Sequence, residues 1–232
     1  MEDTGNFKNG KKHGVWVNHY DNGKLKTMTN YKDGELSGLS EQFYENGKLE
    51  IKVSFKNGKR EGLRETYYDN GQLESRGNCK NDELDGLQES YHRNGQLRDK
   101  SNYKDGKLEG LWEIYHVNGQ LDYRCNHKNG LGEGLREEYY DNGQLWRTVI
   151  FKNGIPFGSW KTYHESGQLK SIQNHKDRQL QGHSVILFEN GKLKSTGFFK
   201  DGKRDGLWEH FNEDGSTDNQ NTGYYKDGEL IK

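Results

Sequence analysis

The chain has 232 residues, of which 28% are hydrophobic and 31% are charged, and its formal net charge is −1. Because the hydrophobic share lies below that of ordinary globular domains, the chain cannot build a thick central core and folds only if repeated units pack on their neighbours. Lys and Glu are interleaved, which excludes a basic surface for nucleic acid or anionic membranes, and no stretch approaches the ~20 apolar residues that span a bilayer.

Two glycine-containing positions recur every 24 residues along the chain. The first is an Asn-Gly pair at 22–23, 46–47, 70–71, 94–95, 118–119, 142–143 and 190–191, with Ser-Gly at 166–167 and Asp-Gly at 214–215 in the same phase. The second is a single glycine, at 14, 38, 62, 86, 110, 134, 158, 182 and 206. A fixed period of this size is typical of repeat arrays. Nine repeats therefore fill residues 1–232, which we interpret as a single domain.

Each repeat contains two predicted turns. An Asn-Gly pair between aromatic or aliphatic runs favours a two-residue type I′ hairpin turn, and the second turn is Lys-Asn/Asp-Gly, as in Lys56-Asn57-Gly58. Two turns leave two strands of eight to ten residues, and no window shows a helical apolar period. The sequence thus predicts an all-β fold: an elongated antiparallel β-hairpin repeat array of about nine 24-residue repeats in a single twisted sheet.

The last repeat departs from this pattern. It carries two extra residues within 216–222 before Tyr224-Tyr225-Lys226-Asp227-Gly228 resumes the repeat. We expect residues 216–232 to form an irregular C-terminal capping repeat with a mobile loop, because a terminal repeat has only one neighbour.

The pairing of strands follows from the Asn-Gly turns. If each is a two-residue loop, Glu89 faces Lys100, Gly86 faces Tyr103 and Tyr20 faces Leu25. Opposite charges then meet across neighbouring strands on one face, where each pair contributes roughly 0.2–1 kcal/mol. On the other face, we expect the Tyr103 ring to lie across Gly86.

The residues that could carry chemistry have structural explanations. His92, His116 and His164 stand where other repeats have Tyr, about 9–10 Å apart for neighbouring copies, which is too far for shared zinc ligation. Cys79 and Cys125 are separated by on the order of 18 Å, so we expect them to be free thiols. Glu50 and Glu65 resemble a pair of catalytic carboxylates, but Lys and Arg flank them on a solvated ladder. We predict no enzyme activity, no cofactor and no metal.

One segment becomes apolar where its sibling repeats are polar. Trp146 replaces Glu, Lys or Arg, Ile150 replaces Asn or Ser, and Phe157 replaces Glu, Asp or Ser, next to the only proline, Pro156. By the pairing rule, Trp146 faces Tyr139, and Ile150 faces both Leu135 and Phe157. An exposed apolar cluster would mark a partner-binding site, made of Leu135, Tyr139, Trp146, Ile150 and Phe157. The alternative is a local cap or kink that the chain itself covers.

The repeat as a whole resembles a known family. The segment Gly110-Leu111-Trp112-Glu113-Ile114-Tyr115-His116-Val117-Asn118-Gly119-Gln120-Leu121 and the turn Tyr103-Lys104-Asp105-Gly106-Lys107 are similar to the MORN-repeat variant of the YwqK-type bacterial antitoxin family. The resemblance implies a non-catalytic scaffold that binds and neutralises a toxin, and it supplies no active-site residues. The alternative function is a lipid-binding or cell-envelope-binding module, as implied by similarity to other MORN repeats.

The expected partner is therefore another protein, and a cognate toxin if the resemblance extends to function. Nucleic acid is not expected, and membrane association is the less favoured alternative because charge is balanced. The polar start Met1-Glu2-Asp3 is unlike a signal peptide. The compartment is cytoplasmic if the chain is complete, and periplasmic or surface if a signal peptide has been removed.

Overall fold

The computed structural model describes residues 3–176 and 179–231, and in that part of the chain every regular element is a β-strand. Contacts divide the chain into two compact units, Met1–Gly119 and Gln120–Lys232. The strand pairs within each unit are antiparallel. The prediction of an all-β antiparallel hairpin array is confirmed, while the single domain over 1–232 stays a prediction.

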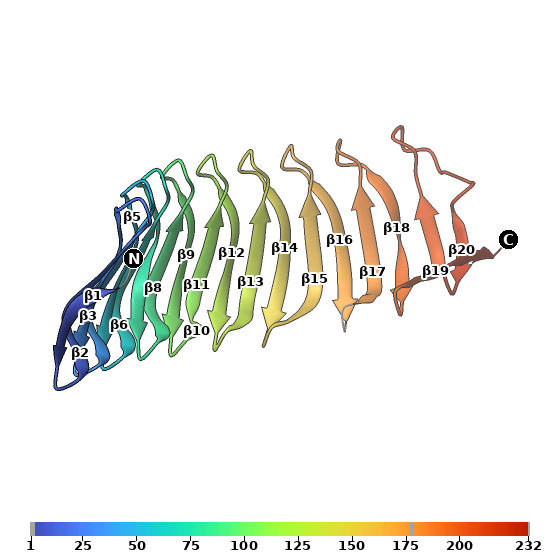
Figure 1. The fold of residues 1–232 in the computed structure, drawn as a ribbon. Helices are drawn as coiled ribbons and strands as arrows, with labels where there is room; N and C mark the ends of the chain where they lie inside the picture. The colour runs from blue at the N-terminus through green and yellow to red at the C-terminus, as the bar shows by residue number, and fades with distance from the viewer. Residues whose placement is uncertain (1–2, 177–178, 232) are drawn as a thin grey trace. The chain divides into compact units, whose positions relative to one another are not determined.

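In the first unit, the strands are β1 (Thr4–Lys8), β2 (Lys11–His19), β3 (Leu25–Lys32), β4 (Glu35–Phe43), β5 (Leu49–Lys56), β6 (Lys59–Tyr67), β7 (Leu73–Lys80), β8 (Glu83–Tyr91), β9 (Leu97–Lys104), β10 (Lys107–Leu108) and β11 (Gly110–Tyr115). In the second unit, they are β12 (Leu121–Lys128), β13 (Leu131–Tyr139), β14 (Leu145–Lys152), β15 (Ile155–Tyr163), β16 (Leu169–Lys176), β17 (Gln179–Leu187), β18 (Leu193–Lys200), β19 (Lys203–His210), β20 (Gly223–Lys226) and β21 (Glu229–Ile231). Consecutive strands of each unit lie side by side, except that β10 and β11 both pair with β9 (Figure 1).

The predicted pairing is confirmed over the strand centres. Glu89 faces Lys100 and Gly86 faces Tyr103 across β8 and β9. The same offset recurs in the second unit, where Gly134 faces Phe151. The charge pattern and the turn spacing of the sequence therefore place these residues correctly.

The predicted conformation of the Asn-Gly turn is wrong. Gly23 N donates to Tyr20 O at 2.9 Å and Tyr20 N donates to Lys24 O at 2.8 Å. Gly23 has a φ of 82°, whereas Asn22 is not among the residues with positive φ. This is a three-residue loop, a type I turn followed by a glycine bulge. The bulge shifts the pairing by one residue, so that His19, not Tyr20, faces Leu25.

The type I′ turns are found instead at Lys-Asn/Asp-Gly. At the first of them, Asn9 has a φ of 52° and Gly10 a φ of 72°, and the flanking Lys8 and Lys11 face each other. Positive φ at both central residues defines a type I′ turn, which favours Asn or Asp followed by Gly. Both predicted turn sites are therefore real, but the type I′ conformation belongs to the second one.

The second periodic glycine lies in a bulge. Gly77 faces Gln88 and Cys79 faces Leu84, so three residues of β8 oppose the single Asn78 of β7. Gly86, inside this bulge, has a φ of 90°, and a Cβ atom added to it would meet no atom within 4 Å. No side chain therefore occupies the position of a Cβ atom on Gly86, and the expectation that the Tyr103 ring lies across its backbone stays a prediction. The bulge requires glycine because of its backbone conformation.

Two other glycines lie directly under aromatic rings. A Cβ atom on Gly5 would lie 2.4 Å from the indole of Trp16, and one on Gly197 would lie 2.4 Å from the indole of Trp208. Both indoles are buried, with 6% and 0% exposure. Packing of aromatic rings on glycine thus occurs at these positions, which lie outside the 24-residue glycine series.

Alternation of side chains gives each unit two different faces. We call the face that carries the buried Cys79, Cys125 and Trp208 the packed face. The opposite face, which we call the ladder face, carries cross-strand ion pairs such as Arg76 Nε to Glu89 Oε2 at 2.7 Å and Arg124 with Glu137. Both cysteines are free thiols, as predicted.

Hydrogen bonds tie successive repeats together at the Asn-Gly end. Tyr44 OH donates to Tyr67 O at 2.8 Å, and Tyr68 OH donates to Tyr91 O at 2.7 Å. At the next copy of this position, His92 Nε2 lies 2.9 Å from Tyr115 O. His92 thus takes over the role of the tyrosine hydroxyl, which agrees with its interpretation as an aromatic replacement.

The insertion in the last repeat folds back on the end of β19. Asp218 N donates to His210 O at 2.8 Å, and His210 N donates to Thr222 Oγ1 at 2.8 Å. The short strands β20 and β21 then resume the hairpin pattern. Mobility of the 216–222 loop stays a prediction.

Candidate functional site

Three of the five predicted site residues form one strip on the ladder face of the second unit. Ile150 of β14 faces Leu135 of β13 on one side and Phe157 of β15 on the other, as predicted. Their exposed fractions are 39%, 48% and 46%. We call these three residues the apolar strip.

Trp146 and Tyr139 do not face each other. Tyr139 faces Leu145, because the glycine bulge in the turn between β13 and β14 shifts the pairing between Glu138 and Tyr139. The Trp146 ring instead lies 6.3 Å from the ring of Tyr140, with the Arg147 guanidinium 4.8 Å above it. The pairing that placed Trp146 opposite Tyr139 is therefore wrong.

The position of Trp146 is occupied by lysine in three other repeats, at Lys26, Lys170 and Lys194. Lys26 Nζ lies 5.5 Å from the Tyr20 ring centre, and Lys194 Nζ lies 5.4 Å from that of Phe188. Trp146 is 41% exposed and stands over the equivalent ring. It is thus an exposed indole at the Asn-Gly end of β14.

The described residues of the chain do not cover the strip. Phe157 stays nearly half exposed, and Pro156 lies within β15, where it faces Phe151 in the regular ladder. Neither the local cap nor the kink that the sequence left open is present here. The three apolar side chains therefore remain in contact with solvent.

Two residues of the strip, Ile150 and Phe157, replace polar residues that have structural roles in other repeats. At the position of Ile150, Asn30 donates from Nδ2 to Leu39 O at 2.8 Å, and Asn174 donates to His183 O at 3.2 Å. At the position of Phe157, Glu133 Oε2 accepts a hydrogen bond from Asn153 N at 2.9 Å. Each such bond contributes about 1 kcal/mol to stability, and neither Ile150 nor Phe157 can form it.

A second apolar cluster lies further along the ladder face of the same unit, and the sequence analysis missed it. Phe198, Leu207 and Tyr224 are 56%, 46% and 63% exposed, and Leu207 faces Tyr224. Phe198 occupies the same repeat position as Ile150, two repeats later. Comparison of all residues at that position would have found it, because both replace Asn or Ser.

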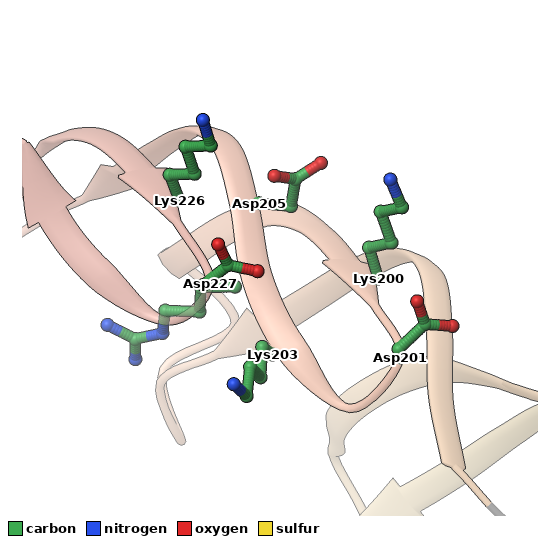
Figure 2. Close-up of a pocket in the computed structure, with 7 residues that line it drawn as sticks. Lys200, Asp201, Lys203, Asp205, Lys226 and Asp227 are labelled. Atoms are coloured by element: carbon green, nitrogen blue, oxygen red, sulfur yellow. The ribbon is translucent and has the colours of Figure 1, made fainter.

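Hollows between neighbouring turns do not form a dedicated site. The one between the turns of Asp201 and Asp227 measures about 260 Å³ and is lined by alternating Lys and Asp. Figure 2 shows the ammonium groups of Lys200 and Lys226 pointing to one side of the hairpins and that of Lys203 to the other. Similar hollows recur between earlier turns. They are therefore a product of stacked turns.

One ionisable group of the predicted site has a shifted pKa. Burial, and then the Glu137 carboxylate, raise the pKa of Tyr139, so its hydroxyl stays protonated at neutral pH. Among the residues that the structure describes, no three His, Cys, Asp or Glu side chains come together as metal ligands. The same residues include no helix that could span a bilayer.

Comparison with protein families gives a match over most of the chain. Eight segments match the family described as MORN repeat variant, at residues 12–33, 36–57, 60–81, 84–105, 108–129, 132–153, 158–177 and 180–201. The chain belongs to the MORN repeat variant family. The seventh segment begins at residue 158, so Pro156 and Phe157 lie outside the matched segments. No curated protein matches the chain.

Proposed function

We propose that this MORN repeat variant protein is a non-catalytic scaffold that binds another protein through the ladder face of its second unit. The observation that carries the proposal is the exposed apolar strip: Ile150 and Phe157 stand where other repeats place hydrogen-bonding side chains, and they lie beside Leu135, a position that is leucine in several other repeats as well. Trp146, beside the Asn-Gly turn, and Tyr139 extend the proposed site.

Energetics support binding over a role in folding. In the free chain, Ile150 and Phe157 lack hydrogen bonds that other repeats make, and 39% and 46% of their surface stays exposed, so part of their apolar surface is left in water until a partner covers it. Covering such surface contributes about 25 cal/mol per Å². The gain arises only when a partner covers the strip, and aromatic residues at the centre of such a surface often dominate the binding energy.

The finer proposal is that the partner is a toxin and that the protein neutralises it. Its support is the resemblance of the Gly110–Leu121 segment and the Tyr103–Lys107 turn to the YwqK-type antitoxin family. A scaffold without catalytic groups would neutralise a toxin by occupying its surface. We expect a toxin gene beside the gene for this protein, and we expect co-expression of this protein to abolish the toxicity of that gene's product. Absence of such a gene would remove the antitoxin role but leave protein binding standing.

The test uses substitutions that restore the ordinary repeat residue. Trp146→Glu and Ile150→Asn should leave the circular dichroism spectrum unchanged. Each should weaken binding of the partner by roughly 2 kcal/mol or more. Ile150→Asn should also stabilise the free protein by about 1 kcal/mol, because the amide can donate as Asn30 does.

The matched control is Leu87→Asn, which changes an exposed ladder-face leucine of the first unit at the same repeat position as Leu135. It should bind the partner normally. If Trp146→Glu unfolds, the indole is part of the core; if both site variants bind normally, the partner docks elsewhere. The lipid-binding alternative would be favoured if the unmodified protein sediments with lipid vesicles and the site variants do not.

A further inference from the structure

The packed face of the second unit contains a hollow of about 110 Å³ between β12, β13 and β14. Its walls include Tyr123, Cys125, His127, Arg136 and Phe151, and its floor is Gly132. Other repeats have a larger residue at the position of Gly132, namely Lys12, Leu36, Arg60, Leu84, Leu108, Pro156, Leu180 and Arg204. The missing side chain therefore creates the space.

Gly132 is not required by the backbone. It is absent from the glycines with positive φ, and an added Cβ atom would lie 3.6 Å from Phe151 Cγ and 3.7 Å from Cys125 Sγ, which are ordinary contacts. A leucine could be built here as in the other repeats. The glycine thus leaves a space that the fold does not need.

Arg136 presents an unused hydrogen-bond donor in this region. Its guanidinium carbon lies 4.9 Å from the Tyr123 ring centre and 5.6 Å from that of Phe151. One terminal nitrogen pairs with Glu138, but the buried Nε has no hydrogen-bond partner. A buried N–H group without a partner destabilises the free protein.

The charges around Arg136 leave an excess of one positive charge. Glu138, which is 6% exposed, pairs with both Arg136 and Arg147, the latter at 2.7 Å. Burial lowers the pKa of His127 and raises the pKa of Tyr123, so both are neutral at pH 7. One carboxylate therefore faces two guanidinium groups, and an anion would balance the second.

We propose that this hollow binds a small organic carboxylate. The carboxylate pairs with the accessible part of the Arg136 guanidinium, whose side chain is 32% exposed, and the short apolar part of the ligand lies over Gly132, between Cys125 and Phe151. Arginine is well suited to this role because it donates to carboxylates while its plane stacks on aromatic rings. The volume is smaller than that of an engineered cavity of about 150 Å³ that holds benzene, so the ligand has few heavy atoms.

The test is a titration of the full chain with propionate, followed by the side-chain Nε–H signals of arginine in NMR spectra. The Arg136 signal should move with a dissociation constant in about the millimolar range. Arg64 is the internal control, since it occupies the same repeat position in the first unit, where Arg60 stands in place of glycine. Its signal should not move.

Two comparisons separate this site from general anion binding. Propionamide and equal concentrations of chloride should leave the Arg136 signal unchanged. Gly132→Leu, which fills the hollow but retains the Arg136–Glu138 pair, should weaken propionate binding about tenfold or more. Equal shifts at Arg64 and Arg136, an equal response to chloride, or full affinity in Gly132→Leu would overturn the proposal.

Discussion

Substitution of Gly86 distinguishes a backbone requirement from a packing requirement. Gly86 has a φ of 90°, and no atom lies within 4 Å of an added Cβ atom, so a new side chain would meet open space. The cost is then that of the left-handed backbone alone, about 1–2 kcal/mol for Gly86→Ala. Gly86→Val should cost about 3 kcal/mol, because β-branched residues are genuine outliers at positive φ. Gly86→Asn should cost less than Ala, since Asn tolerates this region.

A double-mutant cycle with Tyr103→Leu tests the reasoning, with urea unfolding followed by circular dichroism. The two changes should add within about 0.5 kcal/mol, because a Cβ atom at position 86 meets no atom of Tyr103 within 4 Å. Gly197→Ala provides the contrast: its Cβ would lie 2.4 Å from the Trp208 indole, so it should couple strongly to Trp208→Leu. Coupling of more than about 1 kcal/mol between Gly86→Val and Tyr103→Leu would refute the backbone account.

Three further outcomes are expected. Glu89→Gln should cost at most about 1 kcal/mol and less at high salt, because its partner Arg76 is 51% exposed; a larger loss in urea unfolding would show that the ladder is essential. Amides of residues 216–222 should exchange with deuterium faster than those of β8 and β9, and equal protection would contradict a mobile loop. Burial lowers the pKa of His175, so the unfolded chain binds the proton more readily and stability should fall as pH drops below about 6.5. His175→Phe, the residue of several other repeats, should reduce that pH dependence, and an unchanged slope would assign it to other groups.

Strand pairing could be predicted because it depends on repeated local signals. The Glu89–Lys100 and Gly86–Tyr103 pairs follow from the positions of the turns and from charges that alternate in phase. The turn types could not be read in the same way. Asn followed by Gly suits both a type I′ turn and a type I turn with a glycine bulge, and only the hydrogen bonds of the loop decide between them, as at Tyr20 and Lys24.

The candidate site shows the same division. Ile150 lies in the middle of β14, where the pairing is undisturbed, and its neighbours Leu135 and Phe157 were predicted correctly. Trp146 lies beside the glycine bulge, where a shift of one residue moves it from Tyr139 towards Tyr140. The pairing rule assumed a loop without a bulge, so its errors are confined to the ends of the strands.

The tyrosine-to-carbonyl hydrogen bonds span the same 23 residues each time, from Tyr44 to Tyr67 and Tyr68 to Tyr91 in one unit and from Tyr140 to Tyr163 in the other. Each repeat offers a donor to the repeat after it and an acceptor to the repeat before it. Gain or loss of a stretch of 24 codons thus leaves every donor with an acceptor, whereas a change of another length breaks the match. Recombination between repeats can therefore lengthen or shorten the protein in whole steps, and selection can adjust the size of its surface without redesigning a core.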